Sequence, residues 1–246
     1  MAKQYSEIHQ IPYYECDRTQ YLKISTLVKM LIKISGAQSE SLGVSDEYMA
    51  SLGLGWIILQ HDIDIKRLPK AHETIKLTTE AESYNKFFCY RHFWVHDEEG
   101  NECAFMSTTF AIMDLHERKM GSVDEAIIAP FESEKIKRIK RGEKILPVTE
   151  INQEKTYGVR YFDIDLNQHV NNAVYLDWIL DALEGEFLES HNPEKIAIKF
   201  NKEVLYGDDV TSGYQLVDGN TTYHSITSKN ELSAEANIKW VKKIKI

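Results

Sequence analysis

The sequence lacks any long apolar run and has no excess of basic residues. No stretch approaches the roughly 18 uninterrupted apolar residues of a membrane-spanning helix, and the start, MAKQYSEIHQ, lacks the apolar centre of a signal peptide. The formal net charge of −9 argues against a general nucleic-acid binder, because neutralising phosphates requires a basic surface. We therefore expect a soluble, cytoplasmic protein that binds neither membranes nor nucleic acid.

Cysteine is also scarce. The chain of 246 residues has three cysteines, Cys16, Cys89 and Cys103, without metal-type or disulfide-framework spacing, which fits a reducing compartment. The histidines are dispersed without ligand spacing as well, so the sequence implies no metal or organic cofactor. What the chain does contain is 43% hydrophobic and 11% aromatic residues, enough for a packed core in one large domain or two small ones.

The first half of the chain has the pattern of a helix followed by a sheet. Apolar residues at helical spacing predict an amphipathic helix from Ile24 that ends near Gly36, and the stretch from Gln38 to Gly55 predicts a second, short helix. Strand-like runs separated by turn signals follow over residues 56–68, 73–84, 86–97 and 102–115. We assign residues 1–125 to a first α+β repeat with a mainly antiparallel sheet.

Residues 126–150 interrupt this pattern. They contain a run rich in Lys and Arg, bracketed by Pro130 and Pro147, which predicts a solvated basic linker. In so acidic a chain the run is also a candidate docking site for an acidic partner. Residues 151–246 form a second repeat, with a helix from Asn172 and strands from Lys195 to the end.

The two halves resemble each other at a fixed distance. ECDRTQYL at 15–22 matches DIDLNQHV at 163–170, an offset of 148 (163 − 15), and each precedes an amphipathic helix. In the same way KRLP at 66–69 resembles KEVL at 202–205. Self-similarity at half the chain length predicts a duplicated fold.

The two copies differ at their polar positions. The first copy has Thr19, Tyr21 and Arg67 where this comparison places Asn167, His169 and Glu203 in the second. Only the second copy keeps a set of residues able to do acid–base chemistry. We therefore expect the reaction in the second repeat and a binding role for the first.

The polar residues of the second copy lie where extended chain meets a helix. Asp165, Asn167 and His169 alternate, which places their side chains on one side of extended backbone. Asn171 and Asn172 are good N-cap residues, so the trio lies beside unpaired N–H groups at a helix start. Such a position suits chemistry on a carbonyl group.

This segment resembles a known family. D-x-N-x-H-V-N-N followed by a Tyr and a Trp is similar to the signature of the acyl-acyl-carrier-protein thioesterases of plants and bacteria, whose fold is a tandem (double) hotdog. In that fold each of two central helices is wrapped by a mainly antiparallel sheet. The family run Y-R-R-E-C-G-x-D corresponds here to residues 200–208, FNKEVLYGD, where Glu203 matches the glutamate and Val204 replaces the cysteine of some plant members.

The resemblance implies an enzyme that hydrolyses fatty acyl-acyl carrier protein (acyl-ACP) and releases free fatty acid. Its catalytic residues would be Asp165, Asn167, His169 and Glu203. Glu203 and His169 are assigned to water activation and proton transfer, Asn167 to the thioester carbonyl, and Asp165 to orienting His169 or Asn167. Val204 leaves no cysteine at that position, so we expect no acyl-cysteine intermediate.

The remaining expectations concern binding. Candidate residues for the acyl chain are Met49, Trp56 and Ile58, and the carrier protein would dock on Lys135–Arg141 or on basic residues near Lys66. An acyl-CoA thioesterase on the same fold and a non-catalytic acyl-binding protein stay open as alternatives, and a hotdog dehydratase is disfavoured by the spacing of the polar trio. Chain-length preference and a homodimer are also left open.

Overall fold

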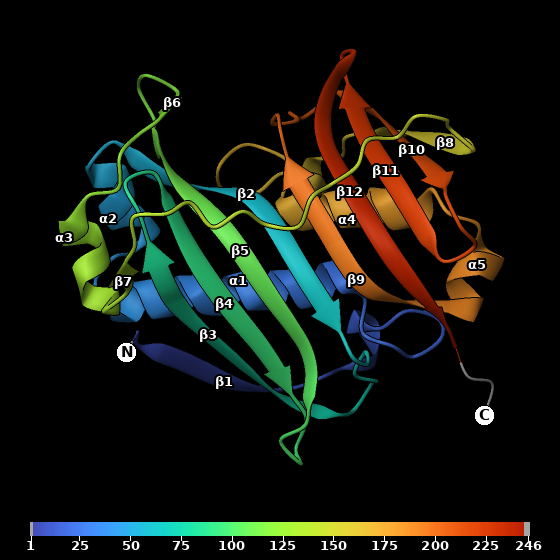
Figure 1. Cartoon of the computed structure of the whole chain (residues 1–246), viewed down its shortest axis with the longest axis horizontal. Coiled ribbons are helices and arrows are strands. Elements are labelled where there is room, and N and C mark those ends of the chain that lie inside the picture. The colour runs from blue at the N-terminus through green and yellow to red at the C-terminus, as the bar shows by residue number, and fades with distance from the viewer. Residues whose placement is uncertain (1, 244–246) are drawn as a thin grey trace. The chain divides into compact units, whose positions relative to one another are not determined.

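The computed structural model describes residues 2–243. The chain divides into two compact units (Figure 1). The first unit runs to Leu22 and from Leu27 to Gly142, and the second contains Lys23–Thr26 and the chain from Glu143 onward. Over the described part of the chain, no helix is both long and apolar enough to cross a membrane.

The first unit packs one long helix against an antiparallel sheet. Its main strands lie in the order β1-β3-β4-β5-β2, and two short strands pair with them, β6 with β5 (antiparallel) and β7 with β3 (parallel). The elements are β1 (Gln4–Gln10), a 3₁₀ turn η1 (Tyr13–Glu15), α1 (Ile24–Ser41), α2 (Asp46–Ser51), β2 (Leu54–Ile65), β3 (Thr74–Tyr84), β4 (Phe88–His96), β5 (Glu102–Asp114), β6 (Lys119–Met120), α3 (Glu125–Ile128), η2 (Ala129–Phe131) and β7 (Glu134–Lys135).

Helix α1 forms because its apolar side chains recur every three or four residues and bury one face. Leu27, Leu31 and Ile34 are fully buried, so burial of this stripe against the sheet stabilises the helix. The prediction that the helix ends near Gly36 is wrong, since α1 continues to Ser41. Its buried face extends to Gln38, whose amide donates to the Lys3 carbonyl, and this tertiary packing outweighs the low helix propensity of glycine.

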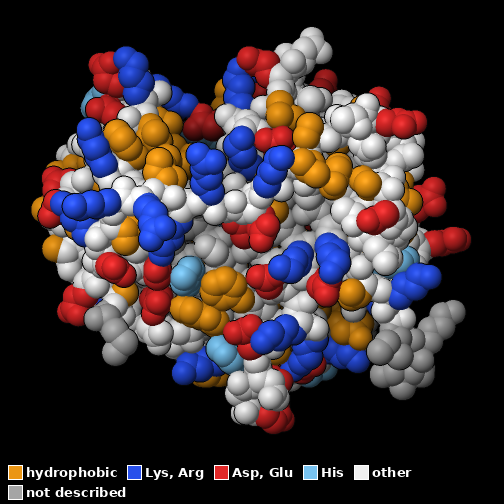
Figure 2. Space-filling view, viewed as in Figure 1, with side chains coloured by type: hydrophobic (Ala, Val, Ile, Leu, Met, Phe, Trp, Pro, Cys, Tyr) orange, Lys and Arg blue, Asp and Glu red, His pale blue; other side chains and the backbone are white. Residues whose placement is uncertain are grey.

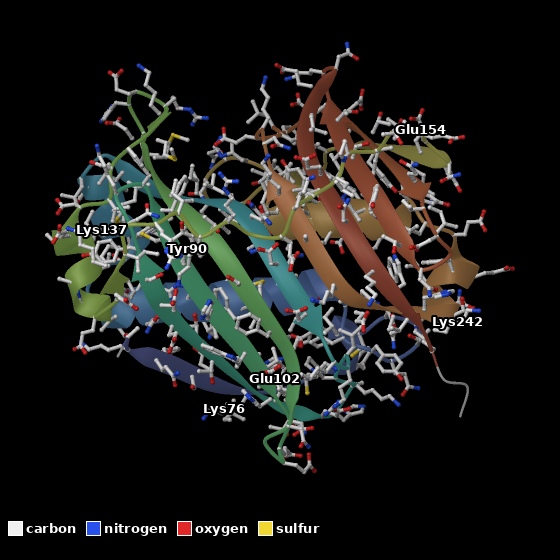
Figure 3. The ribbon with its side chains drawn as sticks, viewed as in Figure 1. Lys76, Tyr90, Glu102, Lys137, Glu154 and Lys242 are labelled. Atoms are coloured by element: carbon white, nitrogen blue, oxygen red, sulfur yellow. The ribbon has the colours of Figure 1, made fainter. Side chains whose placement is uncertain are left out.

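Part of the segment expected to be a linker belongs to the core of the first unit. Ile127, Ile128 and Phe131 are buried in an apolar cluster, because these residues form α3 and η2 rather than solvated chain. Residues 133–142 then cross the sheet on the face opposite α1 (Figure 1). The Tyr90 hydroxyl accepts from the Lys140 N–H at 3.0 Å, and Figure 3 shows Tyr90 beside this segment.

The second unit repeats the arrangement with a shorter helix. Its strands lie in the order β9-β12-β11-β10-β8, all antiparallel. The elements are β8 (Gln153–Gly158), η3 (Tyr161–Asp163), α4 (Asn172–Asp181), α5 (Gly185–Ser190), β9 (His191–Phe200), β10 (Asp209–Leu216), β11 (Thr221–Ser228) and β12 (Glu231–Lys242). The last residues of the final predicted strand, from 244 on, lie outside the described residues.

Backbone hydrogen bonds show that the two units share one loop design. Asp17 N–H donates to the Tyr21 carbonyl at 2.8 Å, and Asp165 N–H donates to the His169 carbonyl at 2.9 Å. The penultimate residue of each turn has a positive φ, 68° at Gln20 and 65° at Gln168. The offset of 148 expected from the sequence therefore describes the structure.

The second stretch of the repeat is shifted by one residue from the expected match. Leu22 N–H donates to the Pro69 carbonyl at 2.9 Å, and its counterpart Val170 donates to the Val204 carbonyl at 3.0 Å. The offset here is 135 (204 − 69), so Glu203 corresponds to Leu68 and the predicted match with Arg67 is wrong. The predicted match rested on the similar side chains of KRLP and KEVL. The backbone hydrogen bonds instead define which residues of the two units correspond.

We predict that two buried histidines make folding sensitive to acid. Burial lowers the pKa of His61 and of His224 to about 3. The unfolded chain would take up these protons below its ordinary histidine pKa of about 6.5, while the folded chain would not. The free energy of unfolding should therefore fall as pH drops from about 6.5 to 4.5, each ring contributing up to about 1.4 kcal/mol per pH unit.

Urea unfolding across this pH range measures the effect. His61→Gln and His224→Gln should each reduce the slope of unfolding free energy against pH, whereas His116→Gln, at an exposed position, serves as the matched control. Equal slopes in all three variants and the wild type would contradict the prediction.

Candidate active site

The loop between η3 and α4 is held in shape by two aspartates. Asp163 is buried and forms an ion pair with Arg160 at 2.7 Å, while its carbonyl accepts from the Asn171 N–H. Asp165 accepts from the Asn167 N–H at 2.9 Å with one carboxylate oxygen and from the Asn171 amide at 3.3 Å with the other. These contacts fix the turn that carries His169.

Asp165 therefore contacts the backbone of the turn. Among the described residues, no hydrogen bond joins the Asp165 carboxylate to the His169 ring. The first unit supports a structural role, because Asp17 accepts from the Thr19 N–H at 2.7 Å in the equivalent turn. The same contact occurs in the first unit, which lacks the His–Glu pair, so it stabilises the turn in both units.

His169 and Glu203 meet across two loops of the second unit. Glu203 Oε2 lies 3.0 Å from His169 Nε2, and the two side chains are 38% and 21% exposed. Both groups are thus within hydrogen-bond distance of each other and open to water. Of the four predicted catalytic residues, these two are brought into direct side-chain contact.

A backbone hydrogen bond aligns this pair. Val170, which follows His169, donates its N–H to the carbonyl of Val204, which follows Glu203, at 3.0 Å. Val170 and Val204 are both buried. The His169 and Glu203 side chains therefore extend from adjacent, anchored backbone positions.

Asn167 and the start of α4 supply hydrogen-bond donors nearby in sequence. Asn167 is exposed, and among the described residues its side-chain amide has no recorded partner. Asn171 is the N-cap of α4 and accepts from the Ala173 N–H at 3.1 Å, as its sequence position predicts. Asn167 can accordingly donate to an oxygen of a ligand.

One contact beside the pair was not foreseen from the sequence. Tyr175 lies on α4, is buried, and accepts a hydrogen bond from the backbone of Val204. Burial raises the pKa of this phenol; the Val204 hydrogen bond opposes the rise, and the negative charges of Glu203 and Asp165 add to it. The sequence marks this residue only as the tyrosine of the family signature, and no sequence pattern indicated its contact with Val204.

The predicted acyl-chain residues lie in the first unit. Met49 is buried in the apolar cluster of α2, α3 and η2, and half-buried Trp56 packs against it with its ring 6.3 Å from Phe110. Ile58 is half-buried on β2 but is not part of that cluster. The structure thus brings Met49 and Trp56 together and leaves Ile58 on the neighbouring stretch of strand.

The cysteines are poorly suited to nucleophilic chemistry. All three are buried, and burial raises the pKa of Cys89 to about 12 and also raises that of Cys103. A thiol with a raised pKa is rarely the reactive thiolate. Position 204, next to Glu203, is a fully buried valine.

The described residues contain no group of three or more His, Cys, Asp or Glu side chains placed to hold a metal ion. The side chains of His169, Glu203 and Asn167 present an imidazole, a carboxylate and a carboxamide. These groups are suited to activating water and stabilising a developing oxyanion.

Comparison with known proteins assigns the family. The acyl-ACP thioesterase N-terminal domain matches residues 2–131, and the acyl-ACP thioesterase C-terminal domain matches residues 147–242. The chain belongs to the acyl-ACP thioesterase family. The sequence-based prediction of this family, whose members are thioester hydrolases, is thereby confirmed.

Solved structures support the same assignment. A crystal structure described as an oleoyl thioesterase from Lactobacillus plantarum is 35% identical, with a TM-score of 0.96 over 99% of this chain and 98% of that one. An acyl-ACP thioesterase from Bacteroides thetaiotaomicron, 19% identical, has a TM-score of 0.87 over 97% and 98% of the two chains. The predicted double hotdog fold is confirmed.

Curated relatives include larger plant proteins. An oleoyl-acyl carrier protein thioesterase of Coriandrum sativum is 26% identical over 94% of this chain and 68% of its own length. A dodecanoyl-[acyl-carrier-protein] hydrolase of Cinnamomum camphora is 23% identical over 82% of this chain and 55% of its own length. The chain therefore spans only about half to two thirds of these relatives.

We predict that Asp165 acts through the shape of its loop, and the duplicated turn provides a matched control. Asp165→Ala and Asp17→Ala should each lower the free energy of unfolding by about 1 kcal/mol, because each removes hydrogen bonds of one turn. Only Asp165→Ala should also lower kcat, by about 10- to 100-fold, since it displaces His169. Thermal unfolding and thioester hydrolysis measure the two effects, and an equal loss of kcat in both variants would contradict this role.

Proposed function

We propose that this protein hydrolyses the thioester of fatty acyl-ACP and releases free fatty acid, which would end chain elongation in fatty acid biosynthesis. The observation that carries the proposal is the 3.0 Å contact between His169 Nε2 and Glu203 Oε2, in a chain of the acyl-ACP thioesterase family. The half-exposed pair has access to water, which is the second substrate of hydrolysis.

The pair activates water. When Nε2 of His169 donates to Glu203, Nδ1 is left as an acceptor, and it has no recorded partner among the described residues. Nδ1 takes a proton from water as the water oxygen bonds to the thioester carbon, and Glu203 stabilises the resulting imidazolium. The carbon–sulfur bond then breaks, and the proton passes to the leaving thiolate, giving fatty acid and carrier thiol.

Asn167 stabilises the carbonyl oxygen. Its exposed side chain lies on the same turn as His169, and its backbone is fixed by the hydrogen bond to Asp165. A donor oriented toward the developing charge contributes about 3 kcal/mol to the stabilisation of an oxyanion. Met49, Trp56 and Ile58 are proposed to contact the acyl chain, since they are apolar and two of them are half-buried.

The first prediction from this mechanism is loss of turnover at His169. His169→Ala and Glu203→Gln should each lower kcat by about 100-fold or more, because general acid–base catalysis is typically worth 100- to 10,000-fold. Tyr21→Ala, at the equivalent position of the first unit, is the matched control and should retain turnover. Thiol release from acyl-ACPs of several chain lengths, with the matching acyl-CoAs alongside, measures the reaction.

The outcomes separate the alternatives. Turnover of acyl-ACP that depends on His169 supports the proposal and reveals the chain-length preference. Turnover of CoA esters alone would favour an acyl-CoA thioesterase on the same fold. Binding without turnover of either ester would favour a non-catalytic acyl-binding protein.

We further propose that the carrier protein docks on the basic segment of the first unit. Two of its cations are already engaged, Lys135 with Glu125 and Lys140 with Glu82. The described residues offer no ion-pair partner to three exposed cations of the segment, which are Lys137, Arg138 and Arg141. In Figure 2 basic side chains lie along the course of this segment, and Figure 3 shows Lys137 projecting from it.

The other expected docking site is less available. Lys66 is paired with Glu102 at 3.0 Å, and Arg67 is paired with Glu73 at 2.7 Å and with Asp97 at 2.9 Å. Arg67 therefore has its guanidinium satisfied within the protein. A cation already paired in this way contributes less to attracting an acidic partner.

Charge reversal tests the docking surface. The triple variant Lys137→Glu, Arg138→Glu and Arg141→Glu should raise KM for acyl-ACP about tenfold and leave kcat unchanged, because steering by charge affects encounter rather than chemistry. Lys76→Glu, on exposed β3 surface of the same unit (Figure 3), is the single-site control. An unchanged KM, or an equal rise in the control, would contradict the docking site. The cytoplasmic location stays a prediction, and the oligomeric state stays open.

A further inference from the structure

The two units differ at two positions that form a hydrogen bond in the second unit, Tyr175 and Val204. Tyr175 corresponds to Leu27 at the offset of 148, and Val204 corresponds to Pro69 at the offset of 135. Leu27 has no polar atom in its side chain, and Pro69 has no backbone N–H. The second unit thus has both a donor and an acceptor where the first has neither.

The donor and the acceptor are bonded to each other. The Tyr175 oxygen accepts a hydrogen bond from the Val204 backbone, while the Val204 carbonyl accepts from Val170 at 3.0 Å. Val204 is fully buried, so without the phenol its N–H would lack this partner in a site closed to water. Leaving a buried donor without a partner costs about 1 to 3 kcal/mol.

The phenol is itself firmly placed. Tyr175 is buried, and its ring makes edge contacts with Trp178 at 5.5 Å and with Phe200 at 5.4 Å between centroids. Phe200 ends β9, three residues before Glu203 (203 − 200). The oxygen of Tyr175 is therefore fixed relative to both the strand that leads to Glu203 and the helix that follows His169.

We propose that Tyr175 is a positioning residue of the catalytic pair: its phenol oxygen holds the Val204 backbone and so keeps Glu203 against His169. The inference rests on the proposed function. Glu203 is 38% exposed, so burial of its own side chain does little to restrict its rotamers. Its position depends on its backbone, which Tyr175 and Val170 anchor through the two polar groups of Val204.

The test compares two Tyr→Phe variants of the second unit, at tyrosines whose rings both contact Trp178. Tyr175→Phe removes only the oxygen that accepts from Val204. Tyr157→Phe is the matched control, because the Tyr157 hydroxyl donates to Asp181 at 2.9 Å, and its ring stacks at 6.3 Å on Trp178, which also contacts the Tyr175 ring. Both variants lose one phenol hydrogen bond in the same unit.

Three readouts decide the proposal. Tyr175→Phe should lower kcat about tenfold, the scale found when supporting groups around a reactive residue are removed, with KM unchanged. Amide hydrogen exchange at Val204 should become faster in Tyr175→Phe and stay at the wild-type rate in Tyr157→Phe. An unchanged kcat, an unchanged Val204 exchange rate, or an equal loss of kcat in the control would overturn the proposal.

A second variant removes the same bond from the donor side. Val204→Pro introduces the residue that the first unit has at the equivalent position, Pro69, whose carbonyl accepts the same backbone hydrogen bond. It should also lower kcat, and combining it with Tyr175→Phe should add little further loss, as expected for two ends of one interaction. Fully additive losses would overturn the proposal. If the wild type hydrolyses neither ester, the proposed function fails, while Val204 exchange still decides whether Tyr175 anchors this backbone.

Discussion

The hydrogen bond from the Val170 N–H to the Val204 carbonyl is the contact on which the candidate site depends. It joins two loops that are 34 residues apart (204 − 170) at 3.0 Å. His169 and Glu203 each immediately precede one end of this bond, so aligning the backbone aligns the two side chains. A contact between two partly exposed side chains contributes little stability by itself. The loops therefore hold the His169–Glu203 contact in place, and the contact does not hold the loops.

The first unit shows that this backbone arrangement does not require the chemistry. Leu22 makes the same bond to Pro69 at 2.9 Å, yet the neighbouring positions are Tyr21 and Leu68. The ring of Tyr21 is instead covered by the Lys70 ammonium at 5.0 Å. One loop design thus serves a cation–π contact in one unit and a carboxylate–imidazole contact in the other, which is why function has to be argued from the side chains rather than from the fold.

The sequence predicted most of the fold because burial periodicity is a local signal. The stripe around Leu27 and the alternating runs of β2 to β5 lie where expected. Gly36 misled the prediction of the helix end, because long-range packing around Gln38 outweighs local propensity. In the site, the prediction of extended backbone through Asp165, Asn167 and His169 is wrong, because these residues form a tight turn in which the Gln168 N–H donates to the Asp165 carbonyl. The register that pairs Glu203 with Leu68 depends on backbone bonds, and the Tyr175 contact joins a side chain to a backbone N–H 29 residues away (204 − 175); neither leaves a sequence pattern.

The residues that hold the backbone of the site are buried, whereas His169 and Glu203 are partly exposed. Val170, Val204 and Tyr175 are nearly inaccessible, while the His169 and Glu203 side chains are 21% and 38% exposed. The proposed mechanism needs water at His169 and Glu203, so these side chains cannot be fixed by burying them. A buried hydrogen bond keeps its geometry because breaking it strands polar groups away from solvent. Such bonds, made one residue away from His169 and from Glu203, hold the two side chains in place and leave them accessible to water.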